Sequence, residues 1–415
     1  MPFVPPEIIS EVLAFSKQDK QTLARCSLVS RQWCQLSSPY LFNNLHLRDP
    51  PAGYPAEPFE ALYAFVERNP RIRCLVRELR LTSVDSLFEV QISLERVRAL
   101  IALLPFLHTI IVGSVQLREI PGEPPLTNEP PASPLQLRYA ALSTSFCLGV
   151  HPTFLSRFLS HFAAIDELHF QGGVAPRALH SAYRFAPPAL HELQPAPHSA
   201  RPAVRVLALG RFDAAQKLLP VLPAFVRVDT LEALRVSHFT GGLVALVDAL
   251  LGQTPRLREL ALSFFRFASA NLAYAVAQSE QYHLPGLARC PRLEALTLGV
   301  EIHLDYDLSD INQVYWRRCL EALGSACPGV RTLTLAIQTW AVTGTNYFEP
   351  LAELDWALLD RLLARFAQLT AVRVDVSSRN IGHWILAEDE MRARLSEKLS
   401  PRIRSLVRIA FADAS

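Results

Sequence analysis

The sequence has little excess charge of either sign and no long hydrophobic run. Its 41 basic and 39 acidic residues leave a net charge of +2 at pH 7, so no strong field favours nucleic acid or an anionic membrane. No stretch approaches the roughly 18 uncharged apolar residues that suggest a membrane-spanning helix. Glu7 and Glu11 interrupt the N-terminal region where a secretory leader would stand. We therefore expect a cytoplasmic or nuclear protein that binds neither nucleic acid nor membrane.

Cysteine is scarce, and the motifs of common catalytic sites are missing. The 7 cysteines are odd in number and scattered, which predicts reduced, mostly buried thiols. The chain has no G-x-S-x-G, no H-E-x-x-H, no phosphate-binding glycine loop and no dinucleotide fingerprint. His180, His191 and His198 lack the tight spacing of metal ligands, and Asp305-x-Asp307-x-x-Asp310 lacks the glycine and glutamate of a calcium loop. We expect no catalytic residue, no metal and no cofactor.

Apolar material is abundant. The 415 residues are 50% hydrophobic and 19% charged, which is typical of a soluble globular chain with a large core. This length predicts either two or three domains or one long repeat array.

The first forty-odd residues predict a set of short helices. Pro5 and Pro6 suit a first helical turn, where a missing N–H costs nothing, and Glu7 complements the positive end of the helix dipole. Asp19 is a plausible N-cap for a second helix. Helices this short must pack together or on a neighbour. On periodicity alone they are either a cap on the core that follows or a module of their own.

The particular residues favour a module. Pro5-Pro6-Glu7-Ile8 followed by Leu28-Val29-Ser30-Arg31-Gln32-Trp33 resembles the F-box, a helical module that docks on the Skp-type adaptor of a cullin ubiquitin ligase, with Val4 in place of the usual leucine. The resemblance implies an F-box-like module over residues 1–46. It also implies an adaptor-binding set, of which some members must instead pack the module itself: Pro5, Pro6, Ile8, Ile9, Leu13, Leu23, Cys26, Val29, Ser30 and Trp33.

A short pattern, apolar-x-x-apolar-x-apolar, recurs along the rest of the chain. Its central apolar residues are Leu79, Ile110, Leu168, Leu207, Leu234, Leu260, Leu296, Leu333, Val372 and Ile409, with Leu45 and Ala140 as weaker candidates. Proline stands five residues before the centre at Pro105, Pro202, Pro255, Pro291 and Pro328, where it would end a helix before a strand. Helical spacing marks the intervening segments 59–68, 94–104, 153–162, 243–251, 315–326 and 352–366. Gly172-Gly173 and Gly241-Gly242 suit tight turns into the next helix.

Residues 47–415 therefore resemble an irregular leucine-rich-repeat array, of the form found behind an F-box in fungal-type F-box proteins. The regular Asn or Cys after each strand is missing. The fold class this implies is an α/β solenoid, a horseshoe with parallel strands inside and helices outside. Proline-rich loops near 121–134 and 187–202 interrupt it, either as insertions without function or as partner-binding loops.

In such an array the residue before the last apolar anchor of each motif points out of the concave face. This gives a candidate target-binding face of Arg80, His169, Arg235, Thr297, Thr334 and Arg373, with Glu78, Glu167, Glu259 and Thr332 beside them. The surface is polar and carries both signs of charge. It suits protein binding, and it equally suits a merely solvated face.

These features lead to a first hypothesis, a non-catalytic substrate receptor of a Skp–cullin–F-box ubiquitin ligase. Its partners would be a Skp-type adaptor, through it a cullin, and a protein substrate. The alternative is a standalone leucine-rich-repeat interaction or structural protein whose N-terminal helices are a cap. An enzyme with a disguised site is a third class, which the missing motifs disfavour.

Overall fold

The structure is a computed structural model. It describes residues 4–48, 58–82, 90–113, 115–118, 134–143, 152–171, 200–210, 218–237, 239–264, 282–304, 309–340, 345–346, 348–378, 383–384 and 386–413. The chain divides into two compact units, Met1–Val204 with Val221–Arg227 and Arg205–Pro220 with Val228–Ser415. Almost all of both predicted proline-rich loops, Gly172-Gly173, the three loop histidines, Asp305 and Asp307 lie outside the described residues.

The first unit begins with three helices and continues as alternating strands and helices. Its helices are α1 (Pro6–Phe15), α2 (Lys20–Ser27), α3 (Arg31–Phe42), α4 (Pro58–Arg68), α5 (Pro70–Arg73), α6 (Leu94–Ala102), α8 (Pro152–Leu159) and α10 (Leu222–Phe225). Its strands are β1 (Asn44–Arg48), β2 (Glu78–Thr82), β3 (Val90–Ser93), β4 (Thr109–Gly113), β5 (Val115–Arg118), β6 (Leu135–Ser143) and β7 (Phe162–Gln171). The strands β1-β2-β4-β6-β7 form a parallel ladder in chain order, and β3 pairs with β5 separately.

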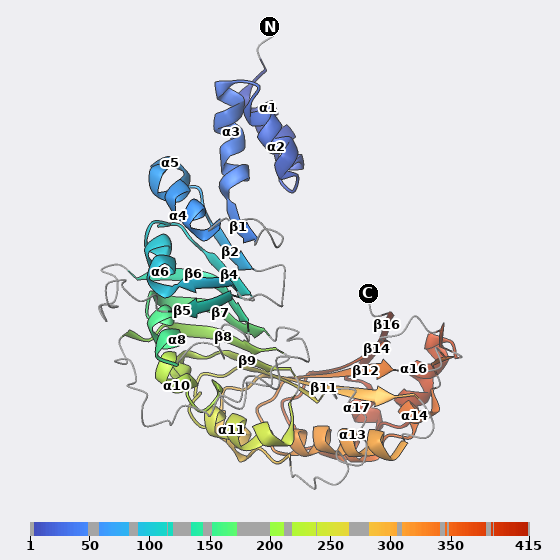
Figure 1. The fold of residues 1–415 in the computed structure, drawn as a ribbon. Coiled ribbons are helices and arrows are strands. Elements are labelled where there is room, and N and C mark those ends of the chain that lie inside the picture. Colours follow the sequence, from blue (N-terminus) through green and yellow to red (C-terminus); the bar gives the residue numbers. More distant parts are fainter. Residues whose placement is uncertain are drawn as a thin grey trace. The chain divides into compact units, whose positions relative to one another are not determined.

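The repeated apolar pattern sets the register of this ladder. The central residues Leu45, Leu79, Ile110, Ala140 and Leu168 lie opposite one another on successive strands and are all buried. Figure 1 shows α4, α6 and α8 along one side of the ladder. Because side chains alternate across a strand, this pattern turns one set of apolar residues toward those helices. Both weaker motifs, centred on Leu45 and Ala140, are thereby confirmed as strands.

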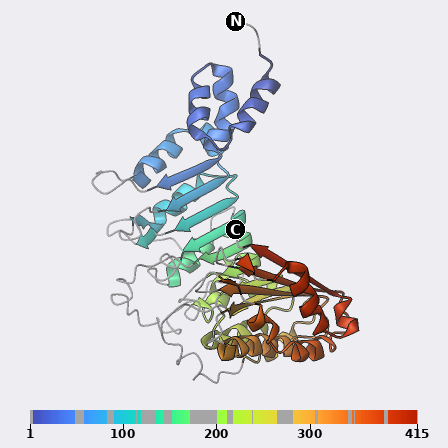
Figure 2. The same ribbon diagram turned by 90° about the vertical axis from the view of Figure 1, so that its right-hand side faces the viewer.

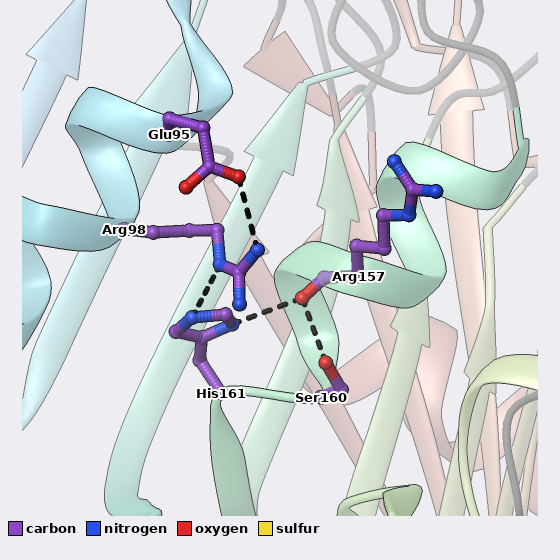
Figure 3. Close-up of polar contacts among 5 residues, drawn as sticks. All are labelled: Glu95, Arg98, Arg157, Ser160 and His161. Carbon is purple, nitrogen blue, oxygen red and sulfur yellow. Dashed lines mark hydrogen bonds and ion pairs between the residues drawn. The ribbon is translucent and has the colours of Figure 1, made fainter. Parts of the chain in front are cut away.

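A buried polar contact joins α6 to the turn between α8 and β7 (Figure 3). Arg98 Nε donates to His161 Nε2 at 2.6 Å, and Arg98 Nη1 lies 3.1 Å from Glu95 Oε1. Since Nε2 accepts, we assign the ring proton to Nδ1, which donates to the Arg157 carbonyl at 2.9 Å. The Ser160 hydroxyl donates to the same carbonyl at 2.8 Å. Burial, and then the Arg98 charge, lower the pKa of His161 to about 4.

The second unit repeats the same plan. Its helices are α11 (Gly241–Leu251), α13 (Ser309–Gly324), α14 (Glu349–Ala352), α15 (Trp356–Leu363), α16 (Glu388–Glu397) and α17 (Pro401–Arg404), with 3₁₀ turns η4 (Val228–Thr230) and η5 (Pro285–Arg289). Its strands are β8 (Ala203–Leu209), β9 (Ala233–Val236), β10 (Glu259–Phe264), β11 (Ala295–His303), β12 (Thr332–Trp340), β13 (Thr345–Asn346), β14 (Ala371–Ser378), β15 (His383–Trp384) and β16 (Val407–Asp413). The parallel ladder runs β8-β9-β10-β11-β12-β14-β16, and β13 pairs with β15 separately.

The register of this second ladder follows the predicted motifs except at its end. The central residues of successive strands lie opposite one another, from Leu207 through Leu234, Leu260, Leu296 and Leu333 to Val372. In the last strand Val407 lies opposite Val372, and Ile409 lies opposite Val374. The prediction of Ile409 as the central residue was therefore wrong by two positions. A shift of two residues keeps the same side chains on the same face, so the apolar pattern does not reveal it.

Three predicted segments differ from the structure. The segment 352–366 was expected as one helix, but α14 ends at Ala352 and Asp355 caps α15 by accepting from the Leu358 N–H at 2.9 Å. The segment 153–162 ends as a helix at Leu159, and Phe162 begins β7. Gly241 and Gly242, expected in a turn, open α11 itself.

The cysteines in the described residues are free thiols of mixed exposure. Cys290, Cys319 and Cys327 are buried, whereas Cys34 and Cys74 are exposed. Burial raises the pKa of Cys290 to about 11 and that of Cys319 to about 12, so both thiols stay protonated. These buried thiols act as small apolar side chains in the core.

Both units thus have a solenoid-like α/β arrangement of parallel strands in chain order with helices between them. The leucine-rich-repeat horseshoe, and the domain boundary after residue 46, stay predictions. That boundary falls inside β1.

Candidate functional site

The three N-terminal helices enclose a small apolar core of their own. Ile9, Leu13 and Leu23 are at most 1% exposed. The partly buried side chains packed on them are Cys26, Trp33, Leu36, Tyr40 and Leu41. In Figures 1 and 2 these helices lie together at the β1 end of the first ladder.

Short polar residues fix where α2 and α3 begin. Asp19 accepts from the Thr22 N–H at 3.0 Å and from the Thr22 hydroxyl at 2.6 Å, which confirms it as an N-cap. These hydrogen bonds, the one from the hydroxyl first, lower the pKa of Asp19. Ser30 caps α3 by accepting from the Trp33 N–H at 3.3 Å. Pro5 and Pro6 stand at the start of α1, as predicted.

A second set of apolar side chains on this module faces solvent. Ile8, Val12 and Phe15 are 50%, 48% and 90% exposed, and their spacing of four and three residues places them on one side of α1. We call these three residues the α1 stripe. Leu28 and Val29, in the turn after α2, are 85% and 66% exposed. Several large exposed apolar side chains in so small a module indicate an interaction surface.

The module is joined directly to the first ladder. α3 ends at Phe42, β1 begins at Asn44, and the Asn43 carbonyl accepts from the N–H groups of Arg77 and Glu78 at 2.8 and 2.9 Å. Lys20 Nζ donates to the Leu41 carbonyl at 2.9 Å, near the negative end of the α3 dipole. Burial lowers the pKa of Lys20.

The structure divides the predicted adaptor-binding set into core and surface. Ile9, Leu13 and Leu23 belong to the core, and Cys26 and Trp33 are half-buried. Pro5, Pro6, Ile8, Val29 and Ser30 are exposed. Whether these residues bind an adaptor stays a prediction.

Sequence reasoning left Val12, Phe15 and Leu28 out of that set, although they are among the most exposed apolar residues of the module. The signal that marks them is the width of the apolar pattern on α1. One stripe, Ile9 and Leu13, is enough for the core. The neighbouring α1 stripe is left half exposed at Ile8 and Val12 and almost wholly exposed at Phe15.

The candidate target-binding residues fall in both units and so do not form one described surface. In the first unit, Arg80 forms an ion pair with Glu78, and His169 Nε2 lies 3.3 Å from Glu167 Oε2. The centre of the His169 ring lies 4.8 Å from that of the Tyr139 ring, and the two planes are tilted by 50°. Burial, and then the Glu167 charge, raise the pKa of that tyrosine.

In the second unit the candidate residues occupy one row of the ladder. Thr297, Thr334 and Arg373 lie opposite one another on β11, β12 and β14, and Arg235 lies two strands earlier. Arg235 and Arg373 are exposed, and the two threonines are half-buried. Arg373 Nε lies 2.6 Å from Asp375 Oδ1. The row is polar and accessible, as expected from the repeat pattern, and its role in binding stays a prediction.

The described residues contain no group of three or more His, Cys, Asp or Glu side chains arranged to hold a metal ion. Within the same part of the chain, no helix has the length and apolarity needed to cross a membrane.

Comparison with known families identifies the N-terminal module. Residues 1–48 match the family model described as F-box-like. The match covers all three helices, both caps, the α1 stripe and β1. An F-box-like domain supports a role in binding the Skp-type adaptor of a cullin ubiquitin ligase. No curated protein matches the chain.

Proposed function

We propose that this protein is a substrate-receptor subunit of a Skp–cullin–F-box ubiquitin ligase. The F-box-like domain would bind the adaptor, and the strand–helix array, proposed to be a leucine-rich-repeat horseshoe, would hold a protein target. The observation that carries the proposal is the set of exposed apolar side chains on this domain, namely the α1 stripe together with Leu28 and Val29.

The size of that surface suits a docking interface. Fully burying one large apolar side chain is worth about 1.5–3 kcal/mol. Ile8 and Val12 are half exposed and Phe15 almost wholly exposed, so the stripe offers roughly 3–5 kcal/mol of the 8 kcal/mol or so that a micromolar complex needs. Leu28, Val29 and the polar rim would supply much of the remainder.

The chain would contribute binding and no chemistry. Holding a target beside a ubiquitin carrier replaces a bimolecular encounter by proximity, so no catalytic residue, metal or cofactor is required of this subunit. The accessible rows around Arg80 and Arg373 are the proposed target-facing surfaces. Exposed free thiols at Cys34 and Cys74 fit a reducing compartment, the cytoplasm or nucleus.

A second candidate is a standalone repeat protein whose N-terminal helices are only a cap. This candidate is favoured by the direct passage from α3 into β1, where the Asn43 carbonyl accepts hydrogen bonds from the N–H groups of Arg77 and Glu78. A terminal cap, however, needs a polar outer face for solubility. The α1 stripe presents the opposite, and this favours the receptor.

The proposal is tested by affinity purification of the tagged intact chain from cells, with and without proteasome inhibition. We expect a Skp-type adaptor and a cullin to copurify with the wild type and to be lost from Ile8→Asp/Phe15→Asp. Gln18→Asp, a change at an exposed residue between α1 and α2, is the matched control and should retain both. Targets should accumulate on the wild type when the proteasome is inhibited. A folded chain that brings down neither adaptor nor cullin would exclude the receptor and favour the standalone protein.

A further inference from the structure

The residue two positions before each central apolar residue belongs to one row across the strands, which we call the edge row. This row directly precedes β2, β4, β9, β10, β11 and β12 and lies inside β6 and β8. In the second unit this row reads Arg205, Glu232, Arg258, Glu294 and Arg331, and each backbone N–H donates to the carbonyl of the preceding member at 2.7–2.9 Å. The charges alternate, which is the favourable arrangement for neighbouring strands.

The same row in the first unit carries basic residue types on three successive strands. Arg77, His108 and Arg138 follow one another, with the same hydrogen bonds at 2.8 Å from each N–H to the preceding carbonyl. Burial, then the Arg138 charge, then the Arg77 charge lower the pKa of His108, so its ring is neutral at pH 7. Neighbouring strands are about 4.8 Å apart, and the two arginine charges therefore lie about 9.6 Å from each other on either side of this neutral ring.

The row has one acidic member, and the other acidic residues nearby are paired elsewhere. Glu78 is paired with Arg80, and Glu167 with His169. Asp166 is the next member of the row and lies beside Arg138, on the neighbouring strand β7. Within the described residues neither Arg77 nor Arg138 forms a salt bridge. Two arginines without a salt-bridge partner can each bind a carboxylate of an anionic partner.

An exposed aromatic ring lies beside the same residues. Phe106 is 48% exposed, and Arg77 Cζ lies 4.8 Å from the centre of its ring. The Arg77 Nη1 donates to the Cys74 carbonyl at 2.8 Å, which holds the guanidinium over the ring. Arg77, Phe106, His108 and Arg138 together make a basic strip with an apolar contact point.

We propose that this basic strip binds an extended acidic segment of a protein partner, with carboxylates three residues apart and an apolar residue between them against Phe106. The spacing supports this. Arg77 and Arg138 are two strand separations apart, about 9.6 Å. An extended polyproline-type segment advances about 3.1 Å per residue and turns once in three residues. Every third side chain therefore lies on one side, about 9.3 Å from the next, within reach of both guanidinium groups.

A carboxylate-bearing peptide is favoured over nucleic acid because the strip is short and the chain carries a net charge of only +2. The inference takes from the proposed function only that the array binds a protein target, and it is independent of the adaptor. Adaptor copurification, measured on the same preparations, therefore distinguishes failure of one from failure of the other.

The test is fluorescence anisotropy of the intact chain with a labelled peptide in which glutamate recurs at every third residue, with leucine and proline between. Glutamine replaces glutamate in the control peptide. We expect the glutamate peptide alone to bind, more weakly as salt rises. Arg138→Gln should weaken binding about tenfold, the loss of one charge-assisted contact, and Phe106→Ala about fivefold.

Arg258→Gln is the matched control, because Arg258 holds the same place in the second edge row, is also exposed and lies between two acidic residues, Glu232 and Glu294. It should leave the affinity unchanged. The inference is overturned if the wild type binds both peptides equally or neither. It is also overturned if Arg138→Gln and Arg258→Gln behave alike, or if single-stranded DNA binds through the strip and the peptide does not.

Discussion

Two consecutive isoleucines in α1 have opposite environments, and substituting each in turn separates docking from folding. Ile8 is 50% exposed in the α1 stripe, and Ile9 is 1% exposed in the core. Replacement by alanine removes the same atoms at both positions. We expect Ile8→Ala to weaken adaptor binding without loss of stability, and Ile9→Ala to destabilise the module.

The magnitudes follow from these exposures. Burying a whole isoleucine side chain is worth about 1.5–3 kcal/mol, and half of Ile8 remains to be buried, so Ile8→Ala should lose about 1 kcal/mol, or roughly fivefold in Kd. Phe15 is 90% exposed, and Phe15→Ala should lose about 2 kcal/mol more. The double variant then binds roughly a hundredfold more weakly. Ile9→Ala leaves a cavity that costs about 2–5 kcal/mol of folding free energy.

Isothermal titration with a purified Skp-type adaptor gives the Kd, and urea unfolding of the same variants gives the stability. Ile8→Ala should unfold at the wild-type urea concentration, since alanine also favours the helix. A stability loss at Ile8 as large as that at Ile9 would refute the division of α1 into a core stripe and an outer stripe. Unchanged adaptor affinity for the Ile8/Phe15 double variant would refute the docking surface.

Other predictions concern the array. The folded protein disfavours the protonated form of His161, so its contribution to stability is complete above pH 6.5 and is lost as the pH falls toward about 4. Between pH 7 and pH 4.5, urea unfolding should show about 2 kcal/mol more loss for the wild type than for His161→Gln, and equal losses would contradict this role. A Cβ on Gly299 would lie 2.9 Å from Ser263 Oγ, so Gly299→Ala should cost about 1–3 kcal/mol in thermal unfolding. A Cβ on Gly113 would lie 3.5 Å from its nearest neighbour, so Gly113→Ala should leave the thermal stability unchanged. Equal losses of stability in the two variants would contradict the close packing at Gly299. The buried Asn312 side chain accepts from the His303 N–H at 2.8 Å and donates to the His303 carbonyl at 2.6 Å. Asn312→Asp should therefore lower the free energy of unfolding by about 1–3 kcal/mol, and an unchanged unfolding midpoint would show that this pair of hydrogen bonds does not stabilise the fold.

The sequence predicted the strands of both ladders because each motif supplies two or three apolar residues with a fixed phase. The sequence pattern predicted Ile409 as the central residue of β16, whereas Val407 lies opposite Val372. The two residues are on the same face of the strand, so the apolar pattern does not distinguish them. It extended one helix to Phe162 because Phe158 and Phe162 stand four residues apart, as on a helix. In the structure the two rings still meet, 5.5 Å apart, across the turn from α8 to β7.

The location of the candidate docking module was also predictable, but its division into core and surface was not. Ile8 and Ile9 differ by one position on a helix whose adjacent stripes are both apolar. Which stripe is buried depends on where α3 packs, and that contact is tertiary. The edge row was missed for a related reason: the sign of each charge is visible in the sequence, but its neighbours across the ladder are known only once the register is known.

Binding of a Skp-type adaptor to the F-box-like domain can be measured by sedimentation velocity of the intact chain mixed with purified adaptor. We expect one faster-sedimenting complex with one copy of each protein, absent for Ile8→Asp/Phe15→Asp. Two species that sediment separately, while the wild-type chain is folded and monomeric, would contradict it.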